Sequence, residues 1–186
     1  MCPHQDYIYL SEPTEEEFSI IQNQRNKTQN IYEEIKNDEV LIKALTNHKI
    51  FLNPSENLEW IYNNLEYYSS VLIFLNSIGK FVTKDHLKVI DTKKFTLPEL
   101  NYEWLEILLS FYLFEDKENF TAYEDHKEKL INKLKRNGLI ERKRINFQYN
   151  QKVDRLISTS LSKLQSIKTI VDVEYSVLRN NLRMVI

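Results

Sequence analysis

The amino-acid sequence predicts a mainly α-helical protein, in which a helical bundle is followed by a basic C-terminal region with a long helix and a small β-hairpin. Three observations lead to this prediction. The 186 residues include only two glycines and four prolines, too few for the many tight turns of a sheet-rich fold. Apolar residues recur every three or four positions, which is the spacing of one helix face. Apolar residues make up 42% and charged residues 28% of the chain, as in folded globular proteins rather than disordered ones.

The first part of the chain contains start and stop signals for three helices. A capping box of Thr14 and Glu17 opens the first, because each side chain can satisfy the backbone N–H of the other residue. Ser55 is the expected N-cap of the third. Gly79 ends it, because glycine readily adopts the left-handed conformation found after many helices. The predicted helices cover residues 15–36, 39–48 and 58–78.

The second part alternates between helical and strand-like patterns. Thr83 caps a short helix, and a capping box of Thr121 and Glu124 opens another that ends at Asn137-Gly138. The segment 98–114 is apolar nearly all round, so we expect it to be the central helix. The predicted helices cover residues 84–90, 98–114, 121–137 and 151–182, the last with a kink near Val173. Between the last two, Ile145, Phe147 and Tyr149 alternate with polar residues as in a strand.

Charge divides the chain near residue 126. Residues 1–125 hold 11 Lys and Arg against 22 Asp and Glu, whereas residues 126–186 hold 14 against 5. We therefore predict a flexible N-terminus over 1–12, an acidic helical bundle over 13–116, and a basic helical region over 117–186. The basic region either packs on the bundle or forms a small second domain. Its charge either meets phosphates or an acidic protein, or is balanced by the acidic helices.

The densest basic segment, Lys127–Arg144, has eight Lys and Arg against two Glu. Residues 121–149 read TAYEDHKEKLINKLKRNGLIERKRINFQY, a helix, an Asn-Gly stop and a basic strand. This pattern resembles the recognition helix and wing of winged-helix DNA-binding regulators. It departs from that family at residues 115–120, which are too few for the short helix that precedes a recognition helix. The resemblance implies contact with duplex DNA through Lys129, Lys133, Lys135 and Arg136 on the helix, and Arg142, Lys143 and Arg144 on the wing.

No catalytic, cofactor-binding or metal-binding motif is present in the sequence. Glycine-rich phosphate loops, nucleophile elbows and the H-E-x-x-H pattern are all absent. Glu103 and Glu106 share a helix face, but the Glu-x-x-His partners of helical-bundle metal sites are missing, so we interpret them as a polar edge. His86 and His126 are interpreted as exposed helix residues. The single cysteine, Cys2, excludes an intrachain disulfide and is interpreted as an incidental thiol.

These observations favour a non-enzymatic regulatory or adaptor protein that needs no cofactor. The first hypothesis is DNA binding through the basic third, with homodimerisation through residues 151–182. The alternative is a protein-interaction module of the inhibitor or immunity type that uses the acidic helices 15–39 or 99–125. The sequence has no apolar N-terminal leader and no apolar run long enough to span a membrane, so we expect a cytoplasmic protein without membrane association.

Overall fold

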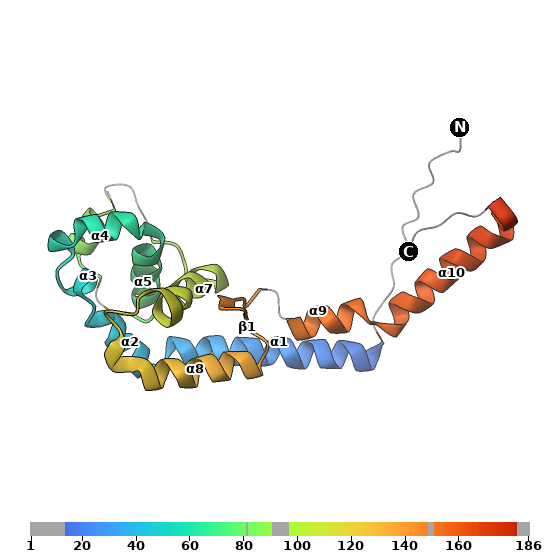
Figure 1. Cartoon of the computed structure of the whole chain (residues 1–186), viewed down its shortest axis with the longest axis horizontal. Coiled ribbons are helices and arrows are strands. Elements are labelled where there is room, and N and C mark those ends of the chain that lie inside the picture. Colours follow the sequence, from blue (N-terminus) through green and yellow to red (C-terminus); the bar gives the residue numbers. More distant parts are fainter. Residues whose placement is uncertain (1–13, 81, 91–96, 149–150, 182–186) are drawn as a thin grey trace. The chain divides into compact units, whose positions relative to one another are not determined.

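The computed structural model describes residues 14–80, 82–90, 97–148 and 151–181 (Figure 1). The expectations for residues 1–12, Tyr149 and Leu182 lie outside the described residues. The chain divides into two compact units, one of residues 26–151 and one that combines 1–25 with 152–186. Helix α1 (Glu15–Lys36) contributes residues to both units, and each unit is described by itself.

The larger unit is helical apart from one small hairpin, as the sequence predicts. Besides the second part of α1, it contains, in chain order, α2 (Glu39–Thr46), α3 (Lys49–Leu52), the 3₁₀ turn η1 (Pro54–Glu56), α4 (Leu58–Asn63), α5 (Leu65–Ser77), α6 (Lys84–Lys88), α7 (Tyr102–Ser110), the π-helical turn η3 (Phe111–Glu115), the 3₁₀ turn η4 (Thr121–Tyr123), α8 (Glu124–Arg136), β1 (Ile140–Glu141) and β2 (Arg144–Ile145). The unit takes in residues from both sides of the predicted domain boundary at 116–117.

Helix α5 forms the centre of the core. Its residues 70–75 are all buried, and six consecutive residues cover the full circumference of a helix. It packs against α7, which contributes Leu105, Leu108 and Leu109. The prediction that 98–114 is the central helix is therefore wrong. Glu103 is exposed and Glu106 only half-buried, so α7 keeps a polar edge that residues 70–75 of α5 lack.

The predicted local stop and start signals are confirmed at four helix ends. The Thr14–Glu17 capping box forms, with Thr14 N–H 3.0 Å from Glu17 Oε2 and Glu17 N–H 3.2 Å from Thr14 Oγ1. Thr83 accepts the N–H of His86 at the start of α6. Gly79 has φ +69° and Gly138 has φ +73°. Each follows a helix whose last carbonyls accept the next two backbone N–H groups, which is the Schellman arrangement.

Several predicted helix boundaries are wrong because polar side chains interrupt the helices. The segment 58–78 is broken at Asn64 into α4 and α5, and the Asn64 amide donates to the carbonyl of Trp60. The segment 39–48 ends at Thr46 because His48 caps α3 by accepting the N–H of Ile50. Ser55 lies within the turn η1 and caps no helix. The box expected at Thr121 and Glu124 does not form, since η4 precedes α8 without a side-chain cap.

The smaller unit combines the start of α1 with α9 (Gln151–Ser158), α10 (Leu161–Leu178) and the 3₁₀ turn η5 (Arg179–Asn181). The predicted single helix over 151–182 is thus two helices. The break comes at Ser160, which caps α10, instead of a kink near Val173. Glu17 joins α1 to this point, because its carboxylate accepts the Leu161 N–H at 3.0 Å and the Ser162 hydroxyl at 3.3 Å.

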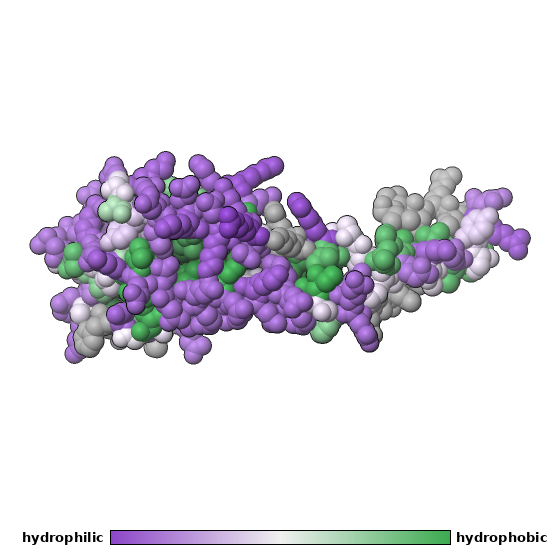
Figure 2. Space-filling model, turned by 90° about the horizontal axis from the view of Figure 1, so that it is seen from below, coloured by the Kyte–Doolittle hydropathy of each residue, from purple (hydrophilic) through white to green (hydrophobic). Residues whose placement is uncertain are grey.

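Most of the surface is hydrophilic, whereas α10 exposes several apolar side chains. Figure 2 shows hydrophobic side chains at the surface of the segment that carries α10. None of the eighteen residues of this helix is buried. No helix among the described residues combines the length and the apolar character needed to cross a membrane.

Candidate nucleic-acid interface

The β-hairpin places two cations at its tip. Strand β1 pairs antiparallel with β2, with Ile140 opposite Ile145 and Glu141 opposite Arg144. The two-residue turn is Arg142-Lys143, with φ of 46° and 74°. Positive φ at both positions is the signature of a type I′ turn, for which Asn-Gly is the preferred sequence. A residue with a Cβ costs roughly 1–2 kcal/mol in this conformation, so the tip carries its two basic side chains at an energetic disadvantage.

The hairpin is held firmly on the core. Leu139, Ile145 and Phe147 are buried, and the Glu106 carboxylate accepts the backbone N–H groups of Phe147 and Gln148. The expected strand over 145–149 is corrected by this geometry: β2 ends at Ile145, and the Phe147 side chain turns into the core instead. Glu106, which we expected to be only part of a polar edge, ties α7 to the hairpin.

Helix α8 leads into the hairpin with one buried and one exposed face. Leu130 and Leu134 are buried. Along the exposed face, the acidic residues come first and the basic residues follow. Its acidic residues are Glu124, Asp125 and Glu128, and its basic residues are Lys129, Lys133, Lys135 and Arg136. Cations near the C-terminus of a helix are favoured by the helix dipole, and this end adjoins the hairpin.

All seven predicted contact residues are exposed, but their surroundings differ. Lys133 forms an ion pair with Glu34 of α1, which runs beside α8 (Figure 1). Arg144 lines a cleft of about 510 Å³ together with Glu66, Glu106 and Glu115. Within the described ranges, no ion pair involves Lys129, Lys135, Arg142 or Lys143. We call the exposed cations of the last turn of α8 and of the hairpin tip the basic patch: Lys135, Arg136, Arg142 and Lys143.

Lys127 belongs to the basic segment in sequence but not to the basic patch. It is only 3% exposed, and its Nζ lies 2.8 Å from Glu124 Oε1. The ammonium also lies 5.9 Å from the ring centroids of Tyr112 and Phe120, within the range of a cation–π contact. Lys127 thus anchors α8 to the core and is not available to a ligand.

His126 fixes the start of α8 to the junction of α1 and α2. Its Nε2 lies 2.8 Å from Asp38 Oδ2, and its Nδ1 lies 2.8 Å from the Tyr112 hydroxyl. Burial raises the pKa of Asp38, but hydrogen bonds from His126 and from the N–H groups of Leu41 and Val40 outweigh this and hold the pKa below its ordinary value. The interpretation of His126 as an exposed residue is wrong. Asp38 also caps α2, but no local pattern in the sequence indicates its contact with His126, 88 positions away.

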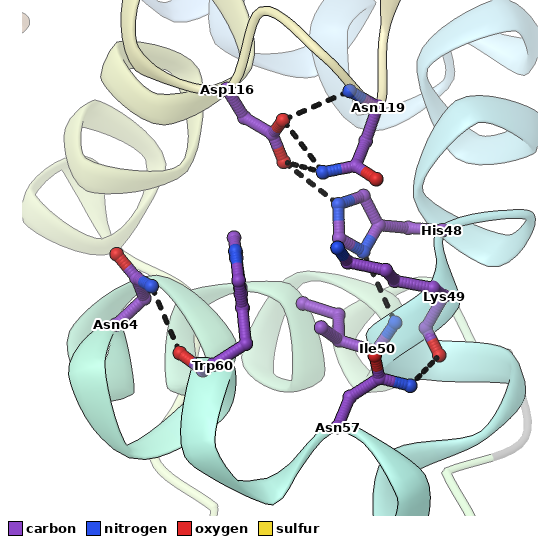
Figure 3. Close-up of polar contacts among 8 residues, drawn as sticks. All are labelled: His48, Lys49, Ile50, Asn57, Trp60, Asn64, Asp116 and Asn119. Carbon is purple, nitrogen blue, oxygen red and sulfur yellow. Dashed lines mark hydrogen bonds and ion pairs between the residues drawn. The ribbon is translucent and has the colours of Figure 1, made fainter.

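A second polar cluster surrounds His48, and its contacts are shown in Figure 3. Its His48–Asp116 pair is more deeply buried than the His126–Asp38 pair. His48 Nδ1 accepts the N–H of Ile50, so the proton is on Nε2, which donates to Asp116 Oδ2 at 2.8 Å. Asn119 donates to the same carboxylate from its backbone and its amide. Burial raises the pKa of Asp116, but the hydrogen bonds from His48 and Asn119 outweigh this and lower it overall.

The His48 cluster resembles part of a catalytic triad but is not arranged for catalysis. A general base needs one free ring nitrogen facing a nucleophile. Both nitrogens of His48 are occupied, and the rings of Trp60 and Phe120 lie 5.5 and 5.2 Å away, centroid to centroid. His86 is likewise buried, with Nε2 2.7 Å from the Phe51 carbonyl oxygen and Nδ1 accepting the Thr83 N–H. Its interpretation as an exposed residue is also wrong.

The part of the chain that the structure describes contains no group of three or more His, Cys, Asp or Glu side chains placed to hold a metal ion. Comparison of the chain with family models, with curated proteins and with solved structures finds no match.

Proposed function

We propose that the protein is a non-enzymatic regulatory or adaptor protein that binds duplex DNA through its phosphate backbone, using the basic patch. The observation that carries the proposal is the hairpin tip. Arg142 and Lys143 occupy positions of positive φ that uncharged Asn-Gly would fill at lower cost. Local strain of this kind points to a functional requirement on the side chains, and the property that these two share is exposed positive charge.

The order of the elements supports duplex DNA as the ligand. Helix α7 with η3, then α8, then the β1–β2 hairpin follow one another in the order helix, recognition helix, wing of the winged-helix regulators that the sequence resembles. The short helix that the sequence lacks before α8 is absent here as well, because only the 3₁₀ turn η4 lies between Glu115 and α8 in the described residues. The resemblance therefore supports the proposal only through the helix and the wing. In such domains the wing contacts phosphate groups.

The charge of α8 determines which part of it meets the DNA. Recognition helices contact base edges with their N-terminal residues. Here Glu124, Asp125 and Glu128 are exposed in that part and would repel phosphates. We therefore propose contact through the last turn of α8 and the hairpin tip, with the bases read weakly or not at all. Among the seven predicted contacts, Lys135, Arg136, Arg142 and Lys143 are the principal ones.

The proposal is tested by titrating a fluorescent duplex with the full chain at several salt concentrations. Four phosphate contacts predict that log K falls against log salt with a slope of about −3 to −4. Replacing Arg142→Ser and Lys143→Ser together should reduce the slope by about 2. The matched control is Lys84→Ser with Lys117→Ser, which removes two exposed lysines outside α8 and the hairpin and should leave the slope unchanged. No binding at about 50 mM salt, or an unchanged slope in the hairpin variant, would refute the proposal.

One observation favours the alternative, an interaction module of the inhibitor or immunity type. The exposed acidic start of α8, Glu124, Asp125 and Glu128, is suited to a basic protein surface. Under this alternative the chain binds no DNA at low salt. It instead forms a stoichiometric complex with a basic protein, and replacing these three residues with glutamine weakens that complex while the Arg142→Ser, Lys143→Ser variant does not.

A further inference from the structure

Helix α10 exposes a row of apolar side chains that no described residue buries. Leu164 is 55%, Tyr175 57% and Leu178 41% exposed, whereas Ile167 and Val171 are half-buried. Isolated helices of this length are marginal in water, because most helical stability in proteins comes from packing an apolar face. Burial of this apolar face against a partner would stabilise the helix. The charges of the helix indicate which partner.

The apolar face of α10 has the spacing of a helix–helix seam. Leu164, Ile167, Val171 and Leu178 follow one another at intervals of three, four and seven residues, which match a, d, a and a positions of a coiled coil, while Glu174 takes the d position between the last two. With 18 residues, the helix is about 27 Å long. This length supports a short, weak interface rather than an obligate one.

The charges beside this seam reverse sign along the helix. Lys163 and Lys168 lie in its first half, and Asp172 and Glu174 in its second. At 100° per residue, Lys163 and Glu174 fall on one side of the midline of the seam, with Glu174 at its edge, and Lys168 and Asp172 fall on the other side. Each flank therefore carries a cation toward the N-terminus and an anion toward the C-terminus.

We propose that two copies of the chain associate through α10, antiparallel about a two-fold axis near residue 169. A parallel pair would place Lys163 against the partner's Lys168 and would bring the acidic ends together. An antiparallel pair places Lys163 beside the partner's Glu174 and Lys168 beside the partner's Asp172. A two-fold axis repeats both contacts. This self-complementary charge order identifies a second copy as the occupant, and the inference does not depend on DNA binding.

The first experiment measures self-association of the full chain by sedimentation equilibrium between about 1 and 100 µM, since an interface of this size predicts a dissociation constant on the order of micromolar. Leu164→Asp should weaken the dimer about tenfold or more. It should leave the fold intact, because no residue of α10 is buried. The control is Ser176→Glu, an exposed position away from the seam, which should not change the constant. A wild-type chain that stays monomeric at 100 µM would overturn the proposal.

The charge pattern is tested with two complementary variants. The Lys163→Glu, Lys168→Glu variant and the Asp172→Lys, Glu174→Lys variant should each self-associate about tenfold more weakly than the wild type. A mixture of the two should recover a dimer, because every flanking contact is again between opposite charges. A dimer of wild-type strength in either variant alone would show that α10 is not the interface.

The orientation is tested by disulfide trapping in a Cys2→Ser background, which removes the only native cysteine. In the antiparallel pair, residue 164 lies opposite residue 175 of the partner, within disulfide reach. Mixing Leu164→Cys with Tyr175→Cys chains should thus give cross-linked dimers, while each variant alone should not. Cross-linking of the Leu164→Cys chain with itself would indicate parallel helices and would overturn the proposed geometry.

Discussion

Asp116 is the residue on which the buried polar structure of the larger unit depends most clearly. Its carboxylate is buried and accepts hydrogen bonds from His48 and from two N–H groups of Asn119. These contacts join the start of α3 to the loop before α8. A buried carboxylate stays ionised only where such donors replace its water. Removal of the charge leaves these donors without their acceptor, so we expect the free energy of unfolding to fall.

We predict that Asp116→Asn lowers the free energy of unfolding at pH 7 by about 2–4 kcal/mol. The pKa of Asp116 is lower in the folded chain than its ordinary value of 3.8. The charge therefore stabilises the fold above that value, and the stabilisation is lost as the pH falls through the lower, folded pKa. Urea unfolding between pH 3 and 7 should show a difference between wild type and variant that shrinks below about pH 4.

Asp85→Asn is the control for this measurement. Its contact with Lys88 is a surface pair in which both side chains are about three-quarters exposed, and such pairs contribute little. The urea midpoint of this variant should match the wild type. If the Asp116→Asn variant were as stable as the wild type at pH 7, the stabilising role of the buried carboxylate would be contradicted.

Among the secondary-structure elements, the β1–β2 hairpin carries positive charge at its turn at the expense of the stability of that turn. Its two strands are short, and its buried residues and Glu106 hold it in place, so its turn need not have the most stable sequence. Arg142 and Lys143 are the residues that depart from the preferred turn sequence. The turn therefore offers a test that separates charge from conformation.

We predict that Arg142→Asn with Lys143→Gly raises the free energy of unfolding by about 1 kcal/mol, because the strain at positive φ is relieved. The same variant should lose DNA affinity, because two phosphate contacts are removed. Urea unfolding and the duplex titration measure the two effects. As a control, Lys143→Arg keeps the charge and should retain affinity. Equal or lower stability of the Asn-Gly hairpin would contradict the strain argument.

Over the whole molecule, the separation of charge along the sequence largely disappears on folding. The larger unit, residues 26–151, contains 18 Lys and Arg against 19 Asp and Glu, a net charge of −1. Some cations of the basic segment are balanced by acidic helices, as in the pairs Lys133–Glu34 and Lys127–Glu124. Balance by acidic residues thus applies to Lys127 and Lys133, and the proposed phosphate contact depends on a local patch.

This arrangement predicts that Glu34 weakens DNA binding by holding Lys133. Glu34→Gln should free Lys133 and strengthen binding about two- to threefold at low salt, with a salt slope steeper by about 1. Glu33→Gln removes the same charge from the neighbouring position of α1 and should not change the slope. A slope unaffected by Glu34→Gln would show that Lys133 does not reach the DNA.

The sequence by itself determined the helical class, the ends of helices at Gly79 and Gly138, and the caps at Thr14 and Thr83. These features follow from interactions between residues that are only a few positions apart in the sequence. The exact positions of the helix breaks at Asn64 and Ser160 were missed, since polar side chains can cap or continue a helix with similar energies.

Only the tertiary structure decided which polar residues are buried and which cations remain open to a ligand. His48 and Asp116 are 68 positions apart, His126 and Asp38 are 88, and Lys133 and Glu34 are 99. No local pattern relates such residues, because packing of the core around α5 brings their elements together. The same packing buries Lys127 and leaves Arg142 and Lys143 exposed, although all three belong to one basic segment of the sequence.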